Sequence, residues 1–511
     1  MSDTKDSRGS RAPLLQVTLD PAAGPLYRQL YEAVRRAVLE GKLAPGTRLP
    51  PSRTLAGELG CSRNTVINAY DQLHAEGYLE GKVGAGSYVS DVLPEALLTA
   101  RPLPRTLAGA RLKPRSLSQR GQSLSPLHQA RGQAPKRPDR AFLPGLPDPD
   151  HFPFDLWSRL LARSWRRPVT GLIRSGGAGG LPALREALAL YLRRARDLDC
   201  TPEQVLITGG AQQAVSLAAQ LLLDPGDTAV MEEPGYPGLR GPLLAAGLKI
   251  APVPVDGEGL SVSHLRRRAP EARMAVVAPS HHYPLCTVMS LKRRLELLDW
   301  ARESEAWILE DDYDSEYRYA GRPLAALQAL DSPAAGGQGR VLYIGSFSKV
   351  LFPSIRLGYL VVPPDLAERF ERGRAALDEH SSMIAQPALA AFLSEGHFAA
   401  HLRRTRLLYA ARQEALLAAA KEHLSGLLTL EPDEAGLHLI ARPSEGLARR
   451  LTDKQMEERA ATRGLACRAL SRYYQETPGQ RGLLLGYAAV PEDAMGQACR
   501  DLADALGPAA R

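Results

Sequence analysis

Cysteine is scarce in this sequence of 511 residues: the chain has five cysteines, and no two of them form a Cys-x-x-Cys pair. Their odd number and wide scatter argue against a disulfide framework and against a cysteine-rich zinc site, so we expect no metal. No stretch approaches the roughly 18–20 uninterrupted apolar residues of a membrane-spanning helix. Residues 1–13 are polar and carry no apolar segment of a secretion signal. We therefore expect a cytoplasmic protein without a membrane anchor.

Net charge is unevenly distributed, although 44% hydrophobic and 23% charged residues are ordinary for a globular protein. Residues 1–93 contain 11 basic and 10 acidic side chains, and residues 141–511 contain 43 and 44. Residues 94–140 contain 10 basic and 2 acidic side chains, and they are rich in Pro, Ser and Gln. This composition predicts a flexible basic linker between two folded domains. The linker is either a spacer alone or also a contact to DNA phosphates.

The first 93 residues carry the pattern of a small helical domain followed by a hairpin. Apolar side chains three or four residues apart within residues 26–38 predict a first helix. A second helix is predicted to start at the cap residue Ser52, and a third to open at residues 61–66. Residues 78–89 are typical of two short strands around a glycine-rich tip. This order predicts a small α+β winged helix-turn-helix domain.

In that geometry the third helix enters the major groove of double-stranded DNA with its N-terminal side chains against the base edges. Arg63 can bind guanine through two hydrogen bonds and Asn64 can pair with adenine, so these two are the expected base readers. The second helix and the wing are expected to contact phosphates. The full set of predicted DNA-binding residues is Arg53, Ser62, Arg63, Asn64, Thr65, Lys82 and Gly84. The alternative is a small helical domain with ordinary surface charge.

The same segment resembles the DNA-binding domain of GntR-type bacterial regulators. The shared pattern is a Pro-Leu-Tyr helix start, Leu-Pro-x-Ser-Arg, Ser-Arg-x-Thr-Val and a Gly-x-Gly wing, and it covers residues 25–89. The resemblance implies that Arg53, Arg63, Asn64 and the wing residue Gly84 contact DNA.

From about residue 142 onward, strand-like apolar runs alternate with amphipathic segments of helix length. Five such runs are residues 205–207, 228–231, 274–277, 307–309 and 341–344. The alternation predicts a large α/β domain with a mainly parallel sheet, whose ligand sites lie at the carboxyl ends of the strands.

Three motifs at predicted strand ends together indicate a site for pyridoxal 5'-phosphate (PLP). Residues 208–213, Thr-Gly-Gly-Ala-Gln-Gln, follow a strand and open a helix, whose N–H groups can bind a phosphate. Residues 310–313, Glu-Asp-Asp-Tyr, supply a carboxylate that can hold a protonated ring nitrogen. Residues 346–349, Ser-Phe-Ser-Lys, supply an amine for a Schiff base and two hydroxyls, with Arg356 close by for phosphate. Each motif alone also fits an ordinary turn or surface segment.

The order of these motifs resembles that of fold type I aminotransferases over residues 141–511. The resemblance implies that Lys349 bonds the cofactor, Asp311 pairs with its ring nitrogen and Tyr313 approaches its ring hydroxyl. It also implies that Tyr236 stacks on the ring. The implied phosphate ligands are Gly210, Ala211, Gln212, Ser346, Ser348 and Arg356.

A GntR-type head fused to an aminotransferase-like body resembles the MocR family of transcription regulators, over essentially the whole chain apart from the linker. The resemblance implies a homodimer, because fold type I sites lie at subunit interfaces. It also implies a small-molecule effector, either PLP itself or an amine or amino acid that reacts with it.

Two departures from the aminotransferase pattern affect the expected activity. Aminotransferases commonly carry Asn-Pro-Thr-Gly where residues 283–286 read Tyr-Pro-Leu-Cys, so the Asn that tunes the ring hydroxyl is absent. Leu484 takes the place of the Arg that binds the substrate carboxylate, and only Arg481 or Arg240 could replace it.

An apolar side chain cannot balance a buried carboxylate. We therefore expect a regulator that senses PLP, the vitamin B6 cofactor, itself. A regulator of vitamin B6 supply fits this expectation better than a regulator of the GABA type. Two alternatives stay open: an active aminotransferase with a DNA-binding appendage, and a dimerisation scaffold with an inactive site.

Overall fold

A computed structural model describes residues 17–82, 86–93, 115–124, 141–166, 177–321, 325–332 and 339–507. The chain divides into two compact units, Met1–Arg115 and Ser116–Arg511, which we call the head and the body. Within the described residues, no helix is both long and apolar enough to cross a membrane.

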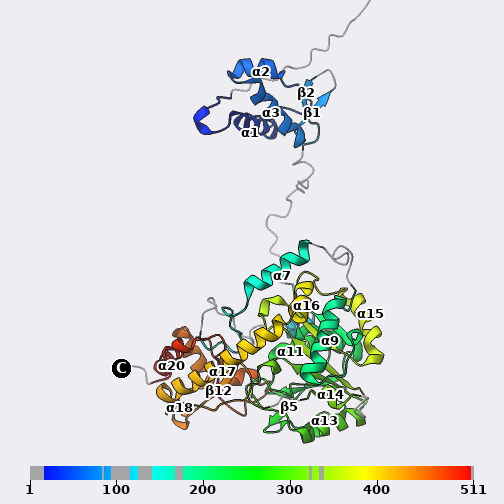
Figure 1. The fold of residues 1–511 in the computed structure, drawn as a ribbon, viewed down its shortest axis with the longest axis vertical. Coiled ribbons are helices and arrows are strands. Elements are labelled where there is room, and N and C mark those ends of the chain that lie inside the picture. The colour runs from blue at the N-terminus through cyan, green and yellow to red at the C-terminus, as the bar shows by residue number, and fades with distance from the viewer. Residues whose placement is uncertain are drawn as a thin grey trace, which may run out of the picture. The chain divides into compact units, whose positions relative to one another are not determined.

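The described part of the head contains three α-helices and a two-stranded hairpin (Figure 1). These elements are α1 Leu26–Leu39, α2 Ser52–Leu59, α3 Arg63–Ala75, β1 Leu79–Lys82 and β2 Gly86–Val89. The two strands pair antiparallel, with Leu79 opposite Val89. Buried side chains from all five elements, including Leu30, Val66 and Leu73, form one apolar core. The winged helix-turn-helix fold predicted from the sequence is confirmed.

The two helix starts at the turn are capped differently. Ser62 caps α3, because its side-chain oxygen accepts a hydrogen bond from the Thr65 N–H at 3.1 Å. The prediction that Ser52 caps α2 is wrong, because Pro51 holds the N-cap position with a φ of −57° and a ψ of 145°. Proline fixes φ near this value, so the helix can begin directly after it. The Ser52 hydroxyl instead accepts a hydrogen bond from Arg63 Nε at 3.4 Å.

The body is built around an eight-stranded mixed sheet with the strand order β3-β10-β9-β8-β7-β4-β5-β6. The strands are β3 Val205–Thr208, β4 Thr228–Glu233, β5 Lys249–Asp256, β6 Gly259–Leu260, β7 Met274–Val277, β8 Trp307–Asp312, β9 Val341–Ser346 and β10 Gly358–Val361. All five apolar runs predicted from the sequence are strands of this sheet. Only β10 and β6 run antiparallel to their neighbours. The carboxyl ends of the parallel strands therefore meet at one edge.

Helices cover both faces of this sheet. Buried side chains join one face to α10 Ala211–Leu222, α11 Pro237–Ala245 and α15 Ala367–Asp378. The other face packs against α12 Val262–Arg268, α13 Leu291–Glu303 and α14 Leu327–Leu330. Toward β3 the same face is covered by α7 Phe154–Arg166, α9 Pro182–Arg196, α16 Gln386–Ser394 and α17 His397–His423.

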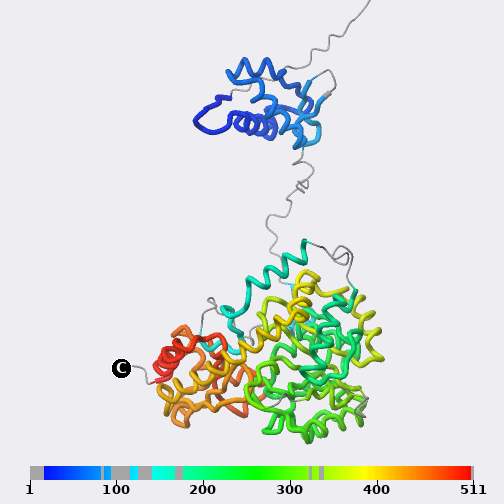
Figure 2. The backbone as a smooth tube through the Cα atoms, in the orientation of Figure 1, coloured from blue at the N-terminus to red at the C-terminus, as the bar shows by residue number. Residues whose placement is uncertain are grey.

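The C-terminal residues form a second, smaller sheet with the antiparallel order β11-β12-β14-β13. Its elements are β11 Leu428–Leu430, β12 His438–Pro443, α18 Glu445–Arg450, α19 Asp453–Thr462, β13 Arg468–Ala469, β14 Leu483–Gly486 and α20 Glu492–Leu506. Figure 2 shows these orange and red residues as a lobe beside the green and yellow large sheet. Helix α17 runs between the two parts of the body (Figure 1).

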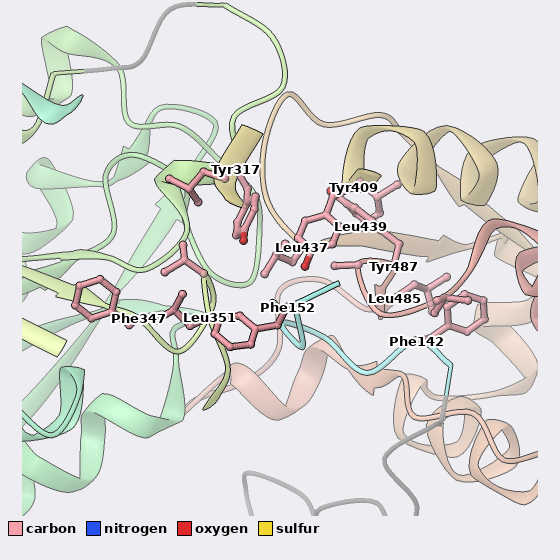
Figure 3. Close-up of a cluster of buried hydrophobic side chains, with 14 of the residues drawn as sticks. Phe142, Phe152, Tyr317, Phe347, Leu351, Tyr409, Leu437, Leu439, Leu485 and Tyr487 are labelled. Carbon is pink, nitrogen blue, oxygen red and sulfur yellow. The ribbon is translucent and has the colours of Figure 1, made fainter. Parts of the chain in front are cut away.

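Residues 141–152, which we call the strap, tie the two sheets of the body together. Phe142 pairs with Gly486 of β14, whose N–H donates to the Phe142 carbonyl at 3.0 Å. Figure 3 shows Phe152 near Leu351 in the cluster of buried side chains that both sheets share. The strap therefore belongs structurally to both lobes of the body.

The segment expected to be a linker contains a short helix, α5 Gln119–Leu124, which packs against α11 of the body. The Ser118 hydroxyl accepts a hydrogen bond from the Gly121 N–H at 3.1 Å, which stabilises the start of this helix. The predicted flexibility of residues 94–114 and 125–140 concerns positions outside the described residues.

Candidate functional site

The first turn of α3 presents the predicted base readers on the surface of the head. Arg63 and Asn64 are exposed, whereas Thr65 is half-buried and its hydroxyl lies 2.8 Å from that of Ser62. Arg53, the second residue of α2, is also exposed. The first turns of α2 and α3 therefore carry two exposed arginines and an exposed amide, the side-chain types that bind phosphates and base edges.

The wing carries the remaining predicted DNA contacts. Lys82 is the last residue of β1 and pairs with Gly86 across the hairpin, but its side chain is outside the described atoms. Gly84 is outside the described residues.

Strand β8 ends in three consecutive buried carboxylates that differ in their partners. Glu310 accepts hydrogen bonds at 2.8 and 2.9 Å from two backbone N–H groups at the start of α14. Asp312 forms an ion pair of 2.6 Å with Arg196. Asp311 points to the opposite face, and its Oδ1 is buried with no hydrogen-bond partner in the described part of the chain. Of the three, Asp311 is therefore the carboxylate available to a ligand.

The electrostatic surroundings of Asp311 disfavour its charge. Burial raises the pKa of Asp311 to about 7, and the carboxylates of Asp312 and Asp314 add to the rise, whereas Lys349 opposes it. Burial lowers the pKa of Lys349, against the opposing effect of Asp314 and Asp311. Burying an unpaired charge is costly, and the cost is usually accepted only where the group serves a ligand. Perturbed pKa values of this kind therefore cluster at functional sites.

Lys349 follows β9 and reaches across to the strap. Its Nζ donates a hydrogen bond of 2.7 Å to the carbonyl of Gly145. Gly145 has a φ of +68°, and a Cβ at this position would lie 2.5 Å from Lys349 Nζ. Glycine is therefore required both by the backbone conformation and by the close approach of the lysine.

Three segments form a cradle for an anion at the N-terminus of α10. Gly210 precedes α10 with a φ of +109°, and a Cβ on it would lie 3.5 Å from Nη1 of Arg356. The first N–H groups of α10, at Ala211 and Gln212, have no intrahelical acceptor and carry the positive end of the helix dipole. The Ser346 hydroxyl accepts a hydrogen bond from the Ser348 N–H at 3.2 Å, in the turn after β9. The predicted phosphate ligands are thus on three neighbouring segments.

One member of this set, Gln212, has its side chain engaged elsewhere. The side-chain amide of Gln212 donates to the carbonyl of Gly238 at 2.7 Å, so it is committed to holding α10 against α11. Only the backbone N–H of Gln212 remains for an anion.

A small pocket lies beside Asp311, between β4, β7, β8 and the start of α11. Tyr236, Tyr283, Val277 and Ala278 line it with Asp311. The Tyr236 ring is 40% exposed and meets the Tyr283 ring edge-on at 5.6 Å between ring centres. Glu232 also lines the pocket, but its carboxyl accepts a hydrogen bond from the Ala278 N–H at 3.0 Å. Aromatic walls and the carboxylate of Asp311 suit a flat, charged heterocycle.

Tyr313 lies on the other side of Tyr283 and contacts a buried histidine. Its hydroxyl is 3.1 Å from Nδ1 of His281, and Nδ1 is also 3.0 Å from Oδ2 of Asp314. Burial opposes a charge on His281, but the Asp314 carboxylate outweighs it and raises the pKa of His281 well above its usual range. The Tyr313 hydroxyl therefore lies against the ion pair of His281 and Asp314.

Leu484, which replaces the carboxylate-binding arginine, lies in β14 and is fully buried. It belongs to an apolar cluster with Ile440 and Leu470, against which Tyr283 and Leu285 pack. Neither possible substitute lies in this cluster. Arg481 is exposed, and burial lowers the pKa of the half-buried Arg240 guanidinium.

Sequence reasoning missed three residues of this site: Gly145, Tyr283 and His281. Tyr283 stands where aminotransferases have Asn, and that substitution of an amide by an aromatic ring was a usable signal. Gly145 lies far from the predicted motifs in sequence, and only the tertiary packing brings it to Lys349. His281 lies two residues before Tyr283, but its contact with Tyr313 also depends on the tertiary packing.

Both units match known protein families. Residues 26–89 match the bacterial regulatory proteins of the gntR family, and residues 170–502 match aminotransferase class I and II. The chain is 43% identical over 483 residues to the probable rhizopine catabolism regulatory protein MocR of Rhizobium meliloti, with 94% of each chain covered.

A second relative and a solved structure extend the comparison. The chain is 32% identical to the pyridoxine biosynthesis transcriptional regulator PdxR of Corynebacterium glutamicum, over 94% of this chain and 95% of that one. The body is similar to Pyrococcus horikoshii kynurenine aminotransferase in complex with PMP, with a TM-score of 0.64 and 25% identity. That match covers 79% of this chain and 97% of the aminotransferase.

The head, the body and these matches define a class of protein: a transcription regulator with a GntR-type DNA-binding domain and an aminotransferase-like domain. Within that class, the chain belongs to the MocR family. The fold of the body implies binding of PLP.

Proposed function

We propose that the body binds PLP at Lys349 and that occupancy of this site changes the affinity of the head for its operator DNA. The observation that carries the proposal is the buried Oδ1 of Asp311, which has no partner in the described part of the chain. A protonated ring nitrogen would supply the missing partner and balance the carboxylate. The aromatic pocket beside Asp311 suits the ring itself.

The other residues of the site fit the remaining parts of the cofactor. Tyr236 would cover the ring, and Tyr313 would approach the ring hydroxyl. The phosphate would be held by Gly210, Ala211, the backbone of Gln212, Ser346, Ser348 and Arg356. When bound, PLP supplies an aldehyde that a lysine amine can bond covalently and a ring that withdraws electrons.

The strap gives the body a way to respond to the state of Lys349. An ammonium has three hydrogens to donate, and in the structure one hydrogen bond from Nζ goes to Gly145. A covalent bond at Nζ removes at least two of these hydrogens, so the contact with Gly145 weakens. The strap ties the two sheets of the body together, so a change at Gly145 alters how the two lobes of the body are joined.

A ligand shifts a conformational equilibrium only when it interacts differently with the two conformations. The hydrogen bond between Lys349 and Gly145 is such a difference, because the cofactor and the strap compete for the same amine. Residues on both sides of Gly145 are fixed, since Asp148 Oδ2 lies 2.6 Å from Arg412 Nη1 and Phe142 is paired with β14. The segment around Gly145 is the part left to move.

The apolar surroundings of Leu484 determine which effector fits. A carboxylate there would meet Ile440, Leu470 and Tyr283 in place of an arginine, and an unpaired buried charge is costly. We therefore propose that the effector is PLP itself and that the regulator controls vitamin B6 supply, as the name of PdxR states for that relative. An amine without a carboxylate is the second candidate, because the same apolar wall would accept it.

Operator binding in the presence of different ligands tests this choice. PLP alone is expected to change the dissociation constant for a promoter fragment from upstream of the regulator's own gene by about 5- to 150-fold, the usual range of allosteric coupling. Common amino acids added with PLP are expected to cause no further change and to yield no keto acid. A response that needs an amino acid, or multiple turnover to keto acid, would contradict the assignment made from Leu484.

Paired half-sites on DNA suit a protein with two heads, so we propose that the chain is a homodimer that acts on double-stranded DNA in the cytoplasm. Arg63 and Asn64 would read bases, Ser62 and Thr65 would support them in the same turn, and Arg53 would bind phosphate. Lys82 and Gly84 would make the wing contacts.

Replacing Arg63 by Ala is expected to weaken binding to the operator by about 1–3 kcal/mol while binding to random duplex changes little, because a base contact contributes mainly to discrimination. The measurement is a pair of binding isotherms, on operator and on random duplex, at one salt concentration. Arg28→Ala, which removes an exposed arginine of α1, is the matched control and should leave both isotherms unchanged. Equal weakening on the two duplexes would show that Arg63 contacts phosphate and not a base.

A further inference from the structure

Behind Tyr313, three side chains from two loops of the body meet in a cluster, of which only His281 also contacts the proposed cofactor site. It consists of His281 in the loop after β7, Cys286 in the same loop, and Asp433 in the loop between β11 and β12. Their ligand atoms, one nitrogen, one sulfur and one carboxylate oxygen, all lie within 4.8 Å of one another.

The imidazole of His281 points an unused nitrogen into this cluster. His281 is 2% exposed, and its Nε2 has no hydrogen-bond partner in the described part of the chain. The nearest carboxylate oxygen, Asp433 Oδ1, is 3.7 Å away, too far for a hydrogen bond. A buried polar atom without a partner requires an explanation, and a bound ion is one of the recognised ones.

The other ring nitrogen of His281 is held in the way that metal-binding histidines require. Nδ1 lies 3.0 Å from Oδ2 of Asp314, a carboxylate that fixes the ring orientation and leaves Nε2 as the ligand atom. Metal-ligating histidines almost always donate their other ring N–H to a carboxylate, a backbone carbonyl or water. A metal ion would displace the protons from His281 Nε2 and from the Cys286 thiol, because these groups bind metal in their deprotonated forms.

Cys286 reaches the cluster at the expense of backbone strain. Its φ is +61°, in the left-handed region that favours glycine, and the Asn-Pro-Thr-Gly motif of aminotransferases has glycine at this position. The thiol has weak contacts, at 3.8 Å to the carbonyls of Pro284 and His438 and at 3.6 Å to Nε2 of His438. Strain held at a half-buried thiol points to a role for the sulfur.

We propose that His281 Nε2, Cys286 Sγ and Asp433 bind a divalent transition-metal ion, with zinc as the best match. Sulfur, imidazole nitrogen and carboxylate oxygen are the three donor types that zinc takes, at about 2.0–2.3 Å. Two such donors on a tetrahedral ion are about 3.3–3.8 Å apart, and His281 Nε2 and Asp433 Oδ1 already have that separation at 3.7 Å. A movement of about 1 Å brings the sulfur into place, and the fourth position is open to water or a small ligand.

The ion would join the two lobes of the body, because His281 and Cys286 belong to the large-sheet part and Asp433 to the C-terminal part. It would also fix His281 against Tyr313, whose hydroxyl is 3.1 Å from Nδ1. Cysteine spacing gave no sign of this site, because a single cysteine contributes and the third ligand comes from a distant segment.

Metal binding by the full chain, dialysed free of unbound cofactor and metal, tests the proposal. Titration with zinc against a chromophoric chelator is expected to show one tight site per chain. Titration with cobalt is expected to give the absorption band of a bond between cobalt and thiolate. Loss of a group that only supports a metal ligand weakens metal binding by roughly 10- to 100-fold. Cys286→Ala and Asp433→Asn change the ligands themselves, so each should weaken zinc binding by at least this factor.

Two controls separate loss of the site from loss of the fold. Asp433→Asn retains Oδ1 as the acceptor for the Ala435 N–H at 3.0 Å, so the loop is expected to keep its structure. Cys61→Ala removes a half-buried thiol of the head and should leave zinc binding intact. Absence of the cobalt band in the parent chain, or zinc binding of equal strength in Cys286→Ala, would overturn the proposal. Neither result depends on whether PLP is the effector.

Discussion

Lys349→Ala is expected to lose all covalently held PLP, whereas the parent chain, saturated with PLP and treated with borohydride, retains one cofactor per subunit. The reason is that Lys349 Nζ is the amine at the carboxyl end of β9, beside both Asp311 and the strap. Absorption of the yellow protein before borohydride, and mass spectrometry after it, measure the retained cofactor.

The matched control is Lys249→Ala, which removes an exposed lysine at the start of β5 and should retain the cofactor fully. Thermal unfolding of both variants without cofactor shows whether loss of the hydrogen bond to Gly145 has disturbed the fold. Cofactor fixed in equal amount to Lys349→Ala would show that another amine forms the link.

Asp311→Asn is expected to stabilise the cofactor-free chain against unfolding and to lower the affinity of the chain for PLP. Burial raises the pKa of Asp311 from 3.8 to about 7, so the folded chain holds a proton there that the unfolded chain releases above about pH 4. Stability of the parent therefore falls as pH rises from about 4 to 7 and stays low above it. At about 1.4 kcal/mol per pKa unit, the asparagine variant should be more stable by on the order of 2–4 kcal/mol at pH 8.

The same substitution removes the charge that would pair with the ring nitrogen of the cofactor. Truncating one partner of a buried charge pair costs about 2–5 kcal/mol, so PLP affinity should fall roughly 30-fold or more. Denaturant unfolding of the cofactor-free chains at several pH values, with PLP titration of each, measures both effects. Asp365→Asn, which changes an exposed carboxylate, should alter neither. A variant that is less stable at pH 8 would mean that Asp311 has a partner of its own.

Most of the fold could be predicted from periodicity. The apolar stripe that begins at Leu26 became α1, and the five strand-like runs became β3, β4, β7, β8 and β9. The prediction failed where one residue decides the outcome. Pro51, with its fixed φ, is the N-cap of α2, so the helix begins at Ser52, the residue predicted to be the cap.

The site could be predicted in part, because the carboxyl ends of parallel strands meet at one edge whatever the details of packing. That rule placed Asp311, Lys349 and Gly210 at one edge of the large sheet, where β8, β9 and β3 end. It could not identify the carboxylate that lacks a partner, since this depends on Arg196 pairing with Asp312. Nor could it place Gly145, which reaches Lys349 only through the tertiary path of the strap.

Operator affinity measured with and without PLP, for the parent chain and for Lys349→Ala, tests the central claim most directly. We expect PLP to change the dissociation constant of the parent by about 5- to 150-fold and to leave that of Lys349→Ala unchanged. Equal operator affinity of the parent with and without PLP would contradict it, and so would an equal PLP response in both proteins.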